Sequence, residues 1–237
     1  MDRIPEPELM ADPDQVTAYA AADFGSSDQA FTDRVLGLLP DPACRVVDLG
    51  CGPGNISFRI AAARPAASVL GIDGAEAMLA LAEQQRLAAP EAAQRLRFLQ
   101  CDLADPALGR PPLAGGFGAV VSNSVLHHLH DPAVFWRAVR SLAAPGAVVV
   151  VRDLRRPDSP AAVEALVALH AADAPDILRR DYRASLFAAF RVEEVQQQLR
   201  DAGLAGWPVA PLEDRYLEVW GRITASPSDG TTAPAAP

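Results

Sequence analysis

The sequence predicts an α/β domain built on a doubly wound, largely parallel sheet. Short runs of Val, Leu and Ile recur from residue 45 onward, and stretches of helical periodicity separate them. Such nearly continuous apolar runs are typical of strands that helices cover on both faces. The first run ends in a turn with glycines at positions 50, 52 and 54, after which a helix begins. At 237 residues the chain is long enough for one such domain with additions.

The core of this domain is expected to alternate strands and helices. The strands are expected at 45–50, 68–73, 96–101, 117–122 and 147–153. The helices between them are expected at 55–63, 75–89 and 132–143. Asp131 and Pro132 suit the start of the last helix, and Pro145-Gly146 is expected to end it.

Further elements are expected on both sides of this core. Residues 1–13 are expected to be flexible, followed by cap helices over 14–40 that pause at Gly25, with Asp28 as a possible helix start and Pro40 as a stop. The domain itself is expected to span 41–223, with a cap insertion at 154–190. A helix over 192–202 should lead to antiparallel edge strands at 207–212 and 215–223, and the tail 224–237 should be disordered.

The composition bounds the partners of the protein. The formal net charge is −9, the pI is near 4.9 and the chain contains no lysine, so contact with a phosphate backbone is disfavoured. No apolar run reaches the roughly 20 residues of a membrane span, and the N-terminus lacks the pattern of a secretory signal. Cys44, Cys51 and Cys101 form no CxxC pair, which indicates a reducing cytoplasm. No nucleic-acid or membrane partner is therefore expected.

Arginines form two local clusters, at 152, 155 and 156 and at 179, 180 and 183. Two interpretations stay open for them. They are solvated helix ends and a loop, or they contact an anionic acceptor.

The stretch from Val46 to Asn55, VVDLGCGPGN, is typical of a turn that holds an adenosine-containing cofactor. Its glycines let a ligand approach the backbone, and the unpaired N–H groups of the following helix point at that ligand. The dinucleotide fingerprint GxGxxG requires glycine at position 55, where this chain has Asn55. Asp48 would lie badly beside a pyrophosphate but suits a ligand with an amino group and a sulfonium. The turn therefore favours such a ligand over a dinucleotide.

This stretch resembles motif I of the class I S-adenosylmethionine-dependent methyltransferases, and the later motifs follow in order over residues 44–151. The resemblance implies a Rossmann-like, seven-stranded sheet of order 3-2-1-4-5-7-6 with the last strand antiparallel. It also implies that Gly50, Gly52 and Gly54 line the methionine part of S-adenosylmethionine and that Asp48 holds its amino end. Asp73 would accept hydrogen bonds from the ribose hydroxyls, and Asp102 would contact the adenine amino group. The other residues assigned to the cofactor are Cys51, Asn55, Gly74, Met78, Leu103 and Asn123. Tyr19 is a further candidate, because the N-terminal helices could fold over the site, and packing is its alternative role.

The methyl acceptor is expected beyond the carboxyl ends of the fourth and fifth strands, where ligands of open parallel sheets lie. The segment SNSVLHHLHDP, residues 122–132, resembles the small-molecule branch of the family, which includes quinone-biosynthesis methyltransferases. It lacks the Pro-Pro-aromatic signature of DNA amino-methyltransferases. The residues expected to contact the acceptor are Phe24, Arg152, Asp153, Arg155 and Tyr182. Packing is the alternative role for Phe24 and Tyr182.

His127 and His128 are the candidate catalytic residues, because an imidazole titrates near neutrality and can act as a general base. The alternative is that one packs beneath the loop and the other fixes its backbone. No metal site is expected. His127, His128 and His130 are so close in sequence that they should point in different directions, and no paired carboxylate or cysteine completes a set.

The sequence thus predicts a cytoplasmic S-adenosylmethionine-dependent methyltransferase that acts on a small molecule by in-line transfer and leaves S-adenosylhomocysteine. The expected oligomeric state is a monomer or a homodimer. Two alternatives stay open: an RNA or protein methyltransferase, and a non-catalytic regulatory protein that binds S-adenosylmethionine.

Overall fold

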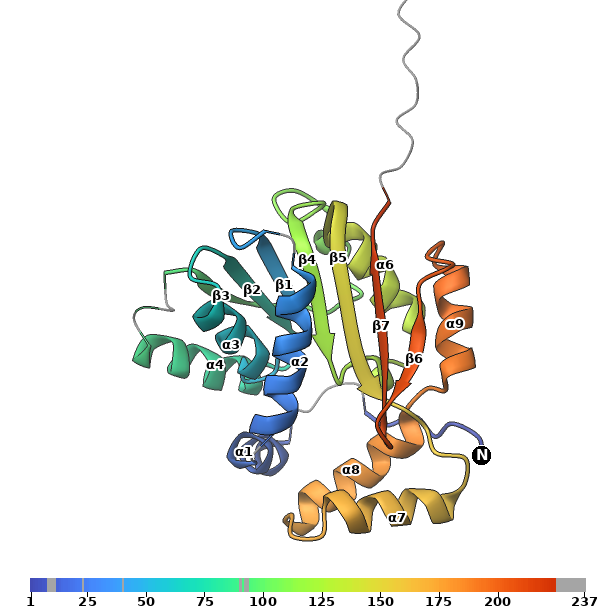
Figure 1. Cartoon of the computed structure of the whole chain (residues 1–237). Helices are drawn as coiled ribbons and strands as arrows, with labels where there is room; N and C mark the ends of the chain where they lie inside the picture. The colour runs from blue at the N-terminus through green and yellow to red at the C-terminus, as the bar shows by residue number, and fades with distance from the viewer. Residues whose placement is uncertain (8–11, 23, 40, 90, 92–93, 225–237) are drawn as a thin grey trace, which may run out of the picture.

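The computed structural model describes residues 1–7, 12–22, 24–39, 41–89, 91 and 94–224. Its centre is a seven-stranded sheet with the order β3-β2-β1-β4-β5-β7-β6 (Figure 1). Neighbouring strands from β3 to β5 are parallel, whereas β7 runs antiparallel to β5 and β6. The predicted strand order and the antiparallel last strand are confirmed. The strands are β1 (Arg45–Leu49), β2 (Ser68–Asp73), β3 (Leu96–Gln100), β4 (Phe117–Asn123), β5 (Ala143–Leu154), β6 (Val209–Leu212) and β7 (Tyr216–Arg222).

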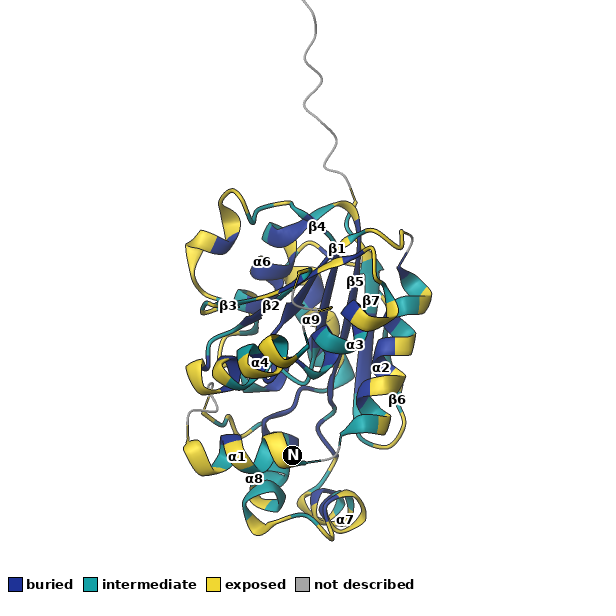
Figure 2. Cartoon of the chain, turned by 90° about the vertical axis from the view of Figure 1, so that its left-hand side faces the viewer, coloured by how far each residue is buried: buried dark blue, intermediate teal, exposed yellow. Residues whose placement is uncertain are grey.

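Helices bury both faces of the sheet, so the strands form a buried middle layer (Figure 2). α2 (Gly25–Leu38) and α3 (Asn55–Ala63) pack on one face, in the same apolar cluster as Val46 of β1. α6 (Pro132–Leu142) and α9 (Val192–Asp201) pack on the other face with Val47. Neighbouring residues of β1 therefore reach opposite cores, which explains why the strands read as continuous apolar runs. α4 (Glu76–Ala88) flanks β2 and β3.

Three further helices lie beyond the carboxyl ends of β4 and β5: α1 (Pro13–Ala21), α7 (Pro160–His170) and α8 (Asp176–Ala188) (Figure 1). We call these three helices the cap. α7 and α8 pack together around Val163, Val167 and Leu186. The Gln15 side-chain amide of α1 donates to the Asp181 carboxylate of α8 over 3.0 Å, so the N-terminal addition and the insertion meet. None of the helices within the described residues combines the length and apolar character needed to cross a membrane.

Two predicted boundaries are wrong. α2 begins at Gly25, so there is no pause at that residue, and Asp28 lies buried in the first turn of the helix rather than capping it. α6 ends at Leu142, before the predicted stop at Pro145-Gly146, and those two residues lie inside β5. The pairing of β4 and β5 shifts between Phe117 and Ala119. A bulge at this point tolerates a proline, which lacks an N–H donor, and a glycine with φ of 81°.

The N-terminal segment, residues 1–7, has no regular secondary structure but is attached to the rest of the molecule. The Met1 ammonium donates to the Asp158 carbonyl, and the Ile4 N–H donates to the Phe187 carbonyl over 3.0 Å. Nothing in the sequence pattern indicated these contacts. Pro40 and residues 225–237, expected as a helix stop and a disordered tail, lie outside the described residues.

Candidate functional site

The turn between β1 and α3 carries three glycines with positive φ: Gly50 (66°), Gly52 (52°) and Gly54 (91°). A Cβ on Gly50 would meet Val125 Cγ2 at 2.2 Å, and one on Gly54 would meet the Phe58 ring at 2.9 Å. A Cβ on Gly52 would meet nothing within 4 Å. Packing therefore accounts for the outer two glycines, whereas Gly52 borders open space that a ligand can approach.

Asp73, at the end of β2, holds the glycine turn from the neighbouring strand. Its Oδ2 accepts the Gly52 N–H over 2.8 Å, and its Oδ1 accepts the Ala75 N–H over 2.8 Å. Burial raises the pKa of this carboxyl, and the backbone hydrogen bonds partly oppose that shift. The structure thus brings the predicted ribose-binding acid and the predicted glycine turn into direct contact.

Asp48 lies at 1% exposure beneath the same turn. Its Oδ2 accepts the Ser57 hydroxyl over 2.7 Å. Burial raises the pKa of Asp48 to about 7, the Ser57 hydrogen bond lowers it, and the nearby charges of Asp73 and Asp28 raise it further. Asp28 of α2 reaches the site as well, because the Asn55 side-chain amide donates to its carboxylate over 3.1 Å. Three carboxylates from three elements therefore converge on the glycine turn.

Helix α1 packs apolar and aromatic side chains against the start of α4, close to Asp73. Val16 and Tyr19 pack with Ala75 and Met78 at the start of α4. Burial raises the pKa of the Tyr19 phenol, as do the charges of Asp28 and Asp73. The ring of Phe24, expected at the acceptor, lies 4.8 Å from the ring of Tyr19. The cap therefore brings predicted cofactor and acceptor residues together beside the acidic groups.

The residues expected at the adenine end lie on the loop after β3. Asp102 is exposed, and its Oδ1 accepts the Ala104 N–H over 2.7 Å. Leu103 is half-buried against the core. Near the turn, the Cys51 thiol is buried close to Gly71, where a Cβ would meet its sulfur at 2.7 Å. Burial raises the pKa of the Cys51 thiol, so this side chain packs as a neutral group.

Asp153, near the end of β5, fixes the loop that follows β4. Its Oδ2 accepts the N–H groups of Val125 and Leu126 over 2.8 and 2.6 Å, and its Oδ1 accepts the Leu154 N–H over 2.7 Å. The same Oδ1 lies 2.6 Å from His127 Nδ1. Asp153 is only 2% exposed, so the structure makes it a support for the loop rather than a free acceptor contact. Val125 of this loop is the residue that packs on Gly50.

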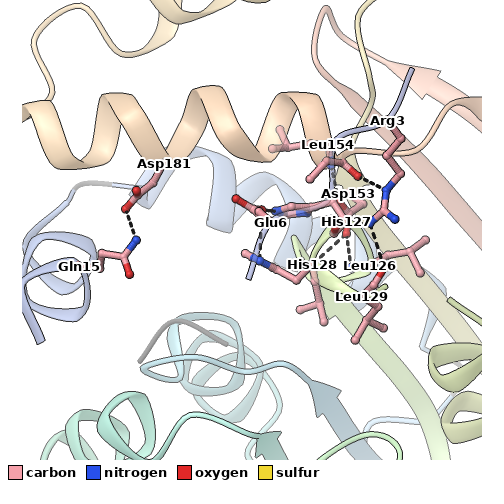
Figure 3. Close-up of polar contacts among 12 residues, drawn as sticks. Arg3, Glu6, Gln15, Leu126, His127, His128, Leu129, Asp153, Leu154 and Asp181 are labelled. Carbon is pink, nitrogen blue, oxygen red and sulfur yellow. Dashed lines mark hydrogen bonds and ion pairs between the residues drawn. The ribbon is translucent and has the colours of Figure 1, made fainter. Parts of the chain in front are cut away.

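His127 and His128, in η2 (Leu126–His128), lie against Glu6 of the N-terminal segment (Figure 3). Burial alone would lower the pKa of His127, but the Asp153 carboxylate and Glu6 raise it above its ordinary value. Burial and the neighbouring His127 lower the pKa of His128 to about 3. Burial raises the pKa of Glu6, and its hydrogen bond with Ser185 opposes the shift. The two expected catalytic histidines are therefore buried, and they lie against the Glu6 carboxylate, which the sequence did not predict there.

The arginines of both clusters have partners within the described structure. Arg152 lies between the rings of Phe31 and Tyr216 and 3.6 Å from Glu218, and Arg155 donates to two backbone carbonyls. The remaining ion pairs are Arg156–Glu194, Arg179–Asp176, Arg180–Asp181 and Arg183–Glu164. Tyr182 packs in the core between α7 and α8. This arrangement supports a structural role for both clusters over contact with an anionic acceptor.

Sequence comparisons assign the central part of the chain. Residues 47–149 match a family described as a methyltransferase domain. The trans-aconitate 2-methyltransferase of Deinococcus radiodurans is 38% identical over 120 residues, which cover 48% of this chain and 40% of that protein. The ubiquinone biosynthesis O-methyltransferase of Xanthomonas campestris pv. campestris is 34% identical over 124 residues, covering 52% and 48%.

A solved structure of a SAM-dependent methyltransferase from Aquifex aeolicus has a TM-score of 0.64, is 17% identical, and is matched over 90% of this chain and 99% of that one. Residues 47–149 of the chain are thus similar to methyltransferase domains, and the strand order matches the one that the resemblance to class I methyltransferases implied. The match to each of the two curated relatives covers less than half of that relative's length. At 17% identity, the Aquifex aeolicus structure shows the shared fold alone.

The acidic groups of the site fit S-adenosylmethionine, the cofactor that the sequence resemblance implied. Asp48 and Asp73 accept hydrogen bonds from a hydroxyl and from backbone N–H groups, and these neutral donors leave the carboxyl pKa values raised. A ligand that carries a sulfonium and an ammonium would neutralise them. Gly52 leaves space for its approach. A dinucleotide pyrophosphate would add negative charge to the same place.

Four residues of the candidate site were not predicted from the sequence. Ser57 and Asp28 contact the acidic group, and Arg3 and Glu6 contact the histidine loop. Ser57 and Asp28 lie on helices with readable periodicity, so a helical projection would have shown them on inward faces. Arg3 and Glu6 lie in a Pro-rich segment that has no periodicity to project.

Proposed function

We propose that this chain transfers a methyl group from S-adenosylmethionine to a small-molecule acceptor. The convergence of Asp48 and Asp73 on the glycine turn, where Gly52 borders open space, carries the proposal. These acids lie at the carboxyl ends of parallel strands and suit a cationic ligand. The proposed catalytic unit spans 41–223, with the cap helices of 14–40 and the 154–190 insertion closing the site.

The proposed cofactor contacts follow the strand ends. Asp73 would accept hydrogen bonds from the ribose hydroxyls. Its Oδ2 would either give up the Gly52 N–H or accept it alongside a hydroxyl. Asp48 would hold the ammonium, and Tyr19 and Met78 would border the adenosine from α1 and α4. The further proposed contacts are Gly50, Gly54, Cys51, Asn55, Gly74, Asp102, Leu103 and Asn123.

The acceptor is proposed to lie between the cofactor and the loop after β4. S-adenosylmethionine supplies an electrophilic methyl group, so the task of the protein is to align the acceptor in line with it and to exclude water. Phe24 and the cap would exclude water, and Asp153 would keep the loop in place through its backbone hydrogen bonds. His127 and His128 are the proposed proton acceptors where the acceptor atom must lose a proton. Of the two, His127, whose pKa is raised, suits this role better than His128, whose pKa is lowered to about 3.

Two observations support a small acceptor and a cytoplasmic enzyme. The relatives named above are, by name, enzymes for trans-aconitate and for ubiquinone biosynthesis, both of which concern small molecules. The net charge of −9 and the lack of lysine disfavour RNA, and the three cysteines are free, as expected of a reducing compartment. A monomer or homodimer is proposed.

The decisive experiment is a calorimetric titration of the protein with S-adenosylmethionine. We expect binding that Asp73→Ala weakens by roughly 10- to 100-fold, since hydrogen bonds to a charged group contribute about 1.5–3 kcal/mol. Asp33→Ala is the matched control, because Asp33 lies exposed on α2 and contacts Gln29. Absence of binding to the wild type would refute the proposal.

Labelled cofactor incubated with a metabolite mixture then tests transfer. Label appearing in a small molecule is the expected result. Tight cofactor binding without transfer to any acceptor would favour the regulatory alternative instead.

A further inference from the structure

We propose that Glu6, His127 and His128 form a binding site for a divalent transition-metal ion of the zinc class. The ligand atoms that these three side chains offer all lie within 4.8 Å of one another. They come from the N-terminal segment and from η2, which Figure 3 shows side by side. The inference rests on this geometry and does not depend on methyl transfer.

The distances suit an ion placed between the side chains. Glu6 Oε1 lies 3.5 Å from His127 Nε2 and 3.2 Å from His128 Nδ1. Ligands bound tetrahedrally to zinc at 2.0–2.1 Å are separated by about 3.3 Å. The two histidine nitrogens lie within 4.8 Å of each other, so seating an ion requires them to approach by no more than about 1.5 Å.

The second nitrogen of His127 is already held as metal-binding histidines usually are. Its Nδ1 lies 2.6 Å from Asp153 Oδ1, which directs Nε2 toward Glu6. Asp153 is in turn fixed by backbone N–H groups, and the Arg3 guanidinium donates to the carbonyls of His127 and Leu129 over 2.8 and 2.9 Å. The two parts of the site are thus positioned independently of any ion.

The buried polar atoms of the cluster point to a cation rather than to a hydrogen bond. Glu6 Oε1 and His128 Nδ1 are buried and have no hydrogen-bond partner. The rings of His127 and His128 lie 4.1 Å apart, and both present a nitrogen to one carboxylate oxygen. A single shared proton can satisfy one of these nitrogens, whereas a metal ion satisfies both. Two imidazoles and one carboxylate are ligands that zinc accepts, with a position left open.

This arrangement explains why the sequence argued against a metal. Adjacent histidines were expected to diverge, but the tight turn of η2 brings both rings toward the same oxygen. The missing carboxylate comes from Glu6, far away in the chain. An ion here would lie beside the loop that contacts the glycine turn.

The test is a titration of the chelator-stripped full chain with Zn²⁺ in competition with a chromophoric chelator. We expect one ion per chain, at least a 100-fold loss of affinity in Glu6→Gln, and a loss of roughly 10- to 100-fold in Asp153→Asn. His170→Gln is the matched control. His170 also pairs with a carboxylate, Asp214, over 2.6 Å, but lies outside the cluster and should leave affinity unchanged.

Circular dichroism and thermal unfolding check that each variant folds, and Glu6→Gln carries the test should Asp153→Asn fail to fold. Co²⁺ in place of Zn²⁺ should give a spectrum without a thiolate band, which distinguishes this site from binding at the free cysteines. Absence of Zn²⁺ binding, or binding that Glu6→Gln leaves intact, would overturn the inference. Cofactor titration on the same samples reports separately on the proposed function.

Discussion

Asp48 is a buried carboxylate whose protonation should be coupled to binding of the proposed cofactor. Burial raises its pKa to about 7 from an ordinary value near 3.8. A raised pKa means that the folded protein favours the protonated form. Its contribution to the free energy of unfolding is therefore complete below about pH 4 and is lost as the pH rises through 7. A cationic ligand has the opposite preference, because it attracts the ionised carboxylate.

We therefore expect the affinity for S-adenosylmethionine to rise between pH 6 and pH 8. At pH 6, binding should release a proton from Asp48. Asp48→Asn should bind more weakly and should lose this dependence, since an amide cannot ionise. Calorimetry at both pH values in buffers of different ionisation enthalpy measures affinity and proton release together. Asp33→Asn should keep the wild-type slope. Equal slopes in the wild type and in Asp48→Asn would contradict this role of Asp48.

Gly50 and Gly52 make a matched pair of substitutions within one turn. Both have positive φ, so alanine at either position should lower the free energy of unfolding by about 1 kcal/mol. Gly50→Ala should lose a further 1–3 kcal/mol or so, because its Cβ would meet Val125 at 2.2 Å. Gly52→Ala should fold but bind the cofactor more weakly, because its Cβ enters the open space. Urea denaturation and calorimetry separate the two effects, and normal binding by Gly52→Ala would place the ligand elsewhere.

At the level of elements, the sequence predicted what periodicity and turn chemistry determine. The strands from β1 to β4, the glycine turn and α3 follow the predicted ranges closely, because apolar runs and glycines act locally. The α6–β5 boundary was missed because Pro145-Gly146 is typical of a helix end, but the pairing with β4 draws these residues into a strand. Tertiary pairing prevailed over local propensity.

The cap shows the same contrast between local and distant contacts. The sequence predicted helical additions on both sides of the core, and α1, α7 and α8 are present. It could not predict that Gln15 of α1 meets Asp181 of α8, nor that Arg3 crosses to the loop after β4. These contacts join residues far apart in the chain, and no local pattern records which of them meet.

For the whole molecule, the candidate site consists of residues that a local motif predicts and residues that only tertiary packing brings in. Asp48, Asp73 and the glycines were predicted from a contiguous motif and its spacing along the sheet, and the structure places them together. Asp28 and Glu6 enter from elements outside that motif, so only the folded chain shows them. The donor side is therefore readable from sequence, whereas the acceptor side depends on how the cap and the N-terminal segment pack.

Because the site joins the sheet to the cap, a bound cofactor should stabilise the molecule as a unit. A ligand at 100 times its dissociation constant adds about 2.7 kcal/mol to the free energy of unfolding. For a domain of this size that predicts a rise in the unfolding midpoint of about 5–10 °C, seen by calorimetry as a single shifted transition. With the product S-adenosylhomocysteine as the ligand at the same concentration, Asp73→Ala should show about half of this shift or less, as expected for binding weakened roughly 10- to 100-fold. An equal shift in that variant would mean that the ligand binds away from the glycine turn, and a separate unshifted transition would mean that the cap unfolds independently of the sheet.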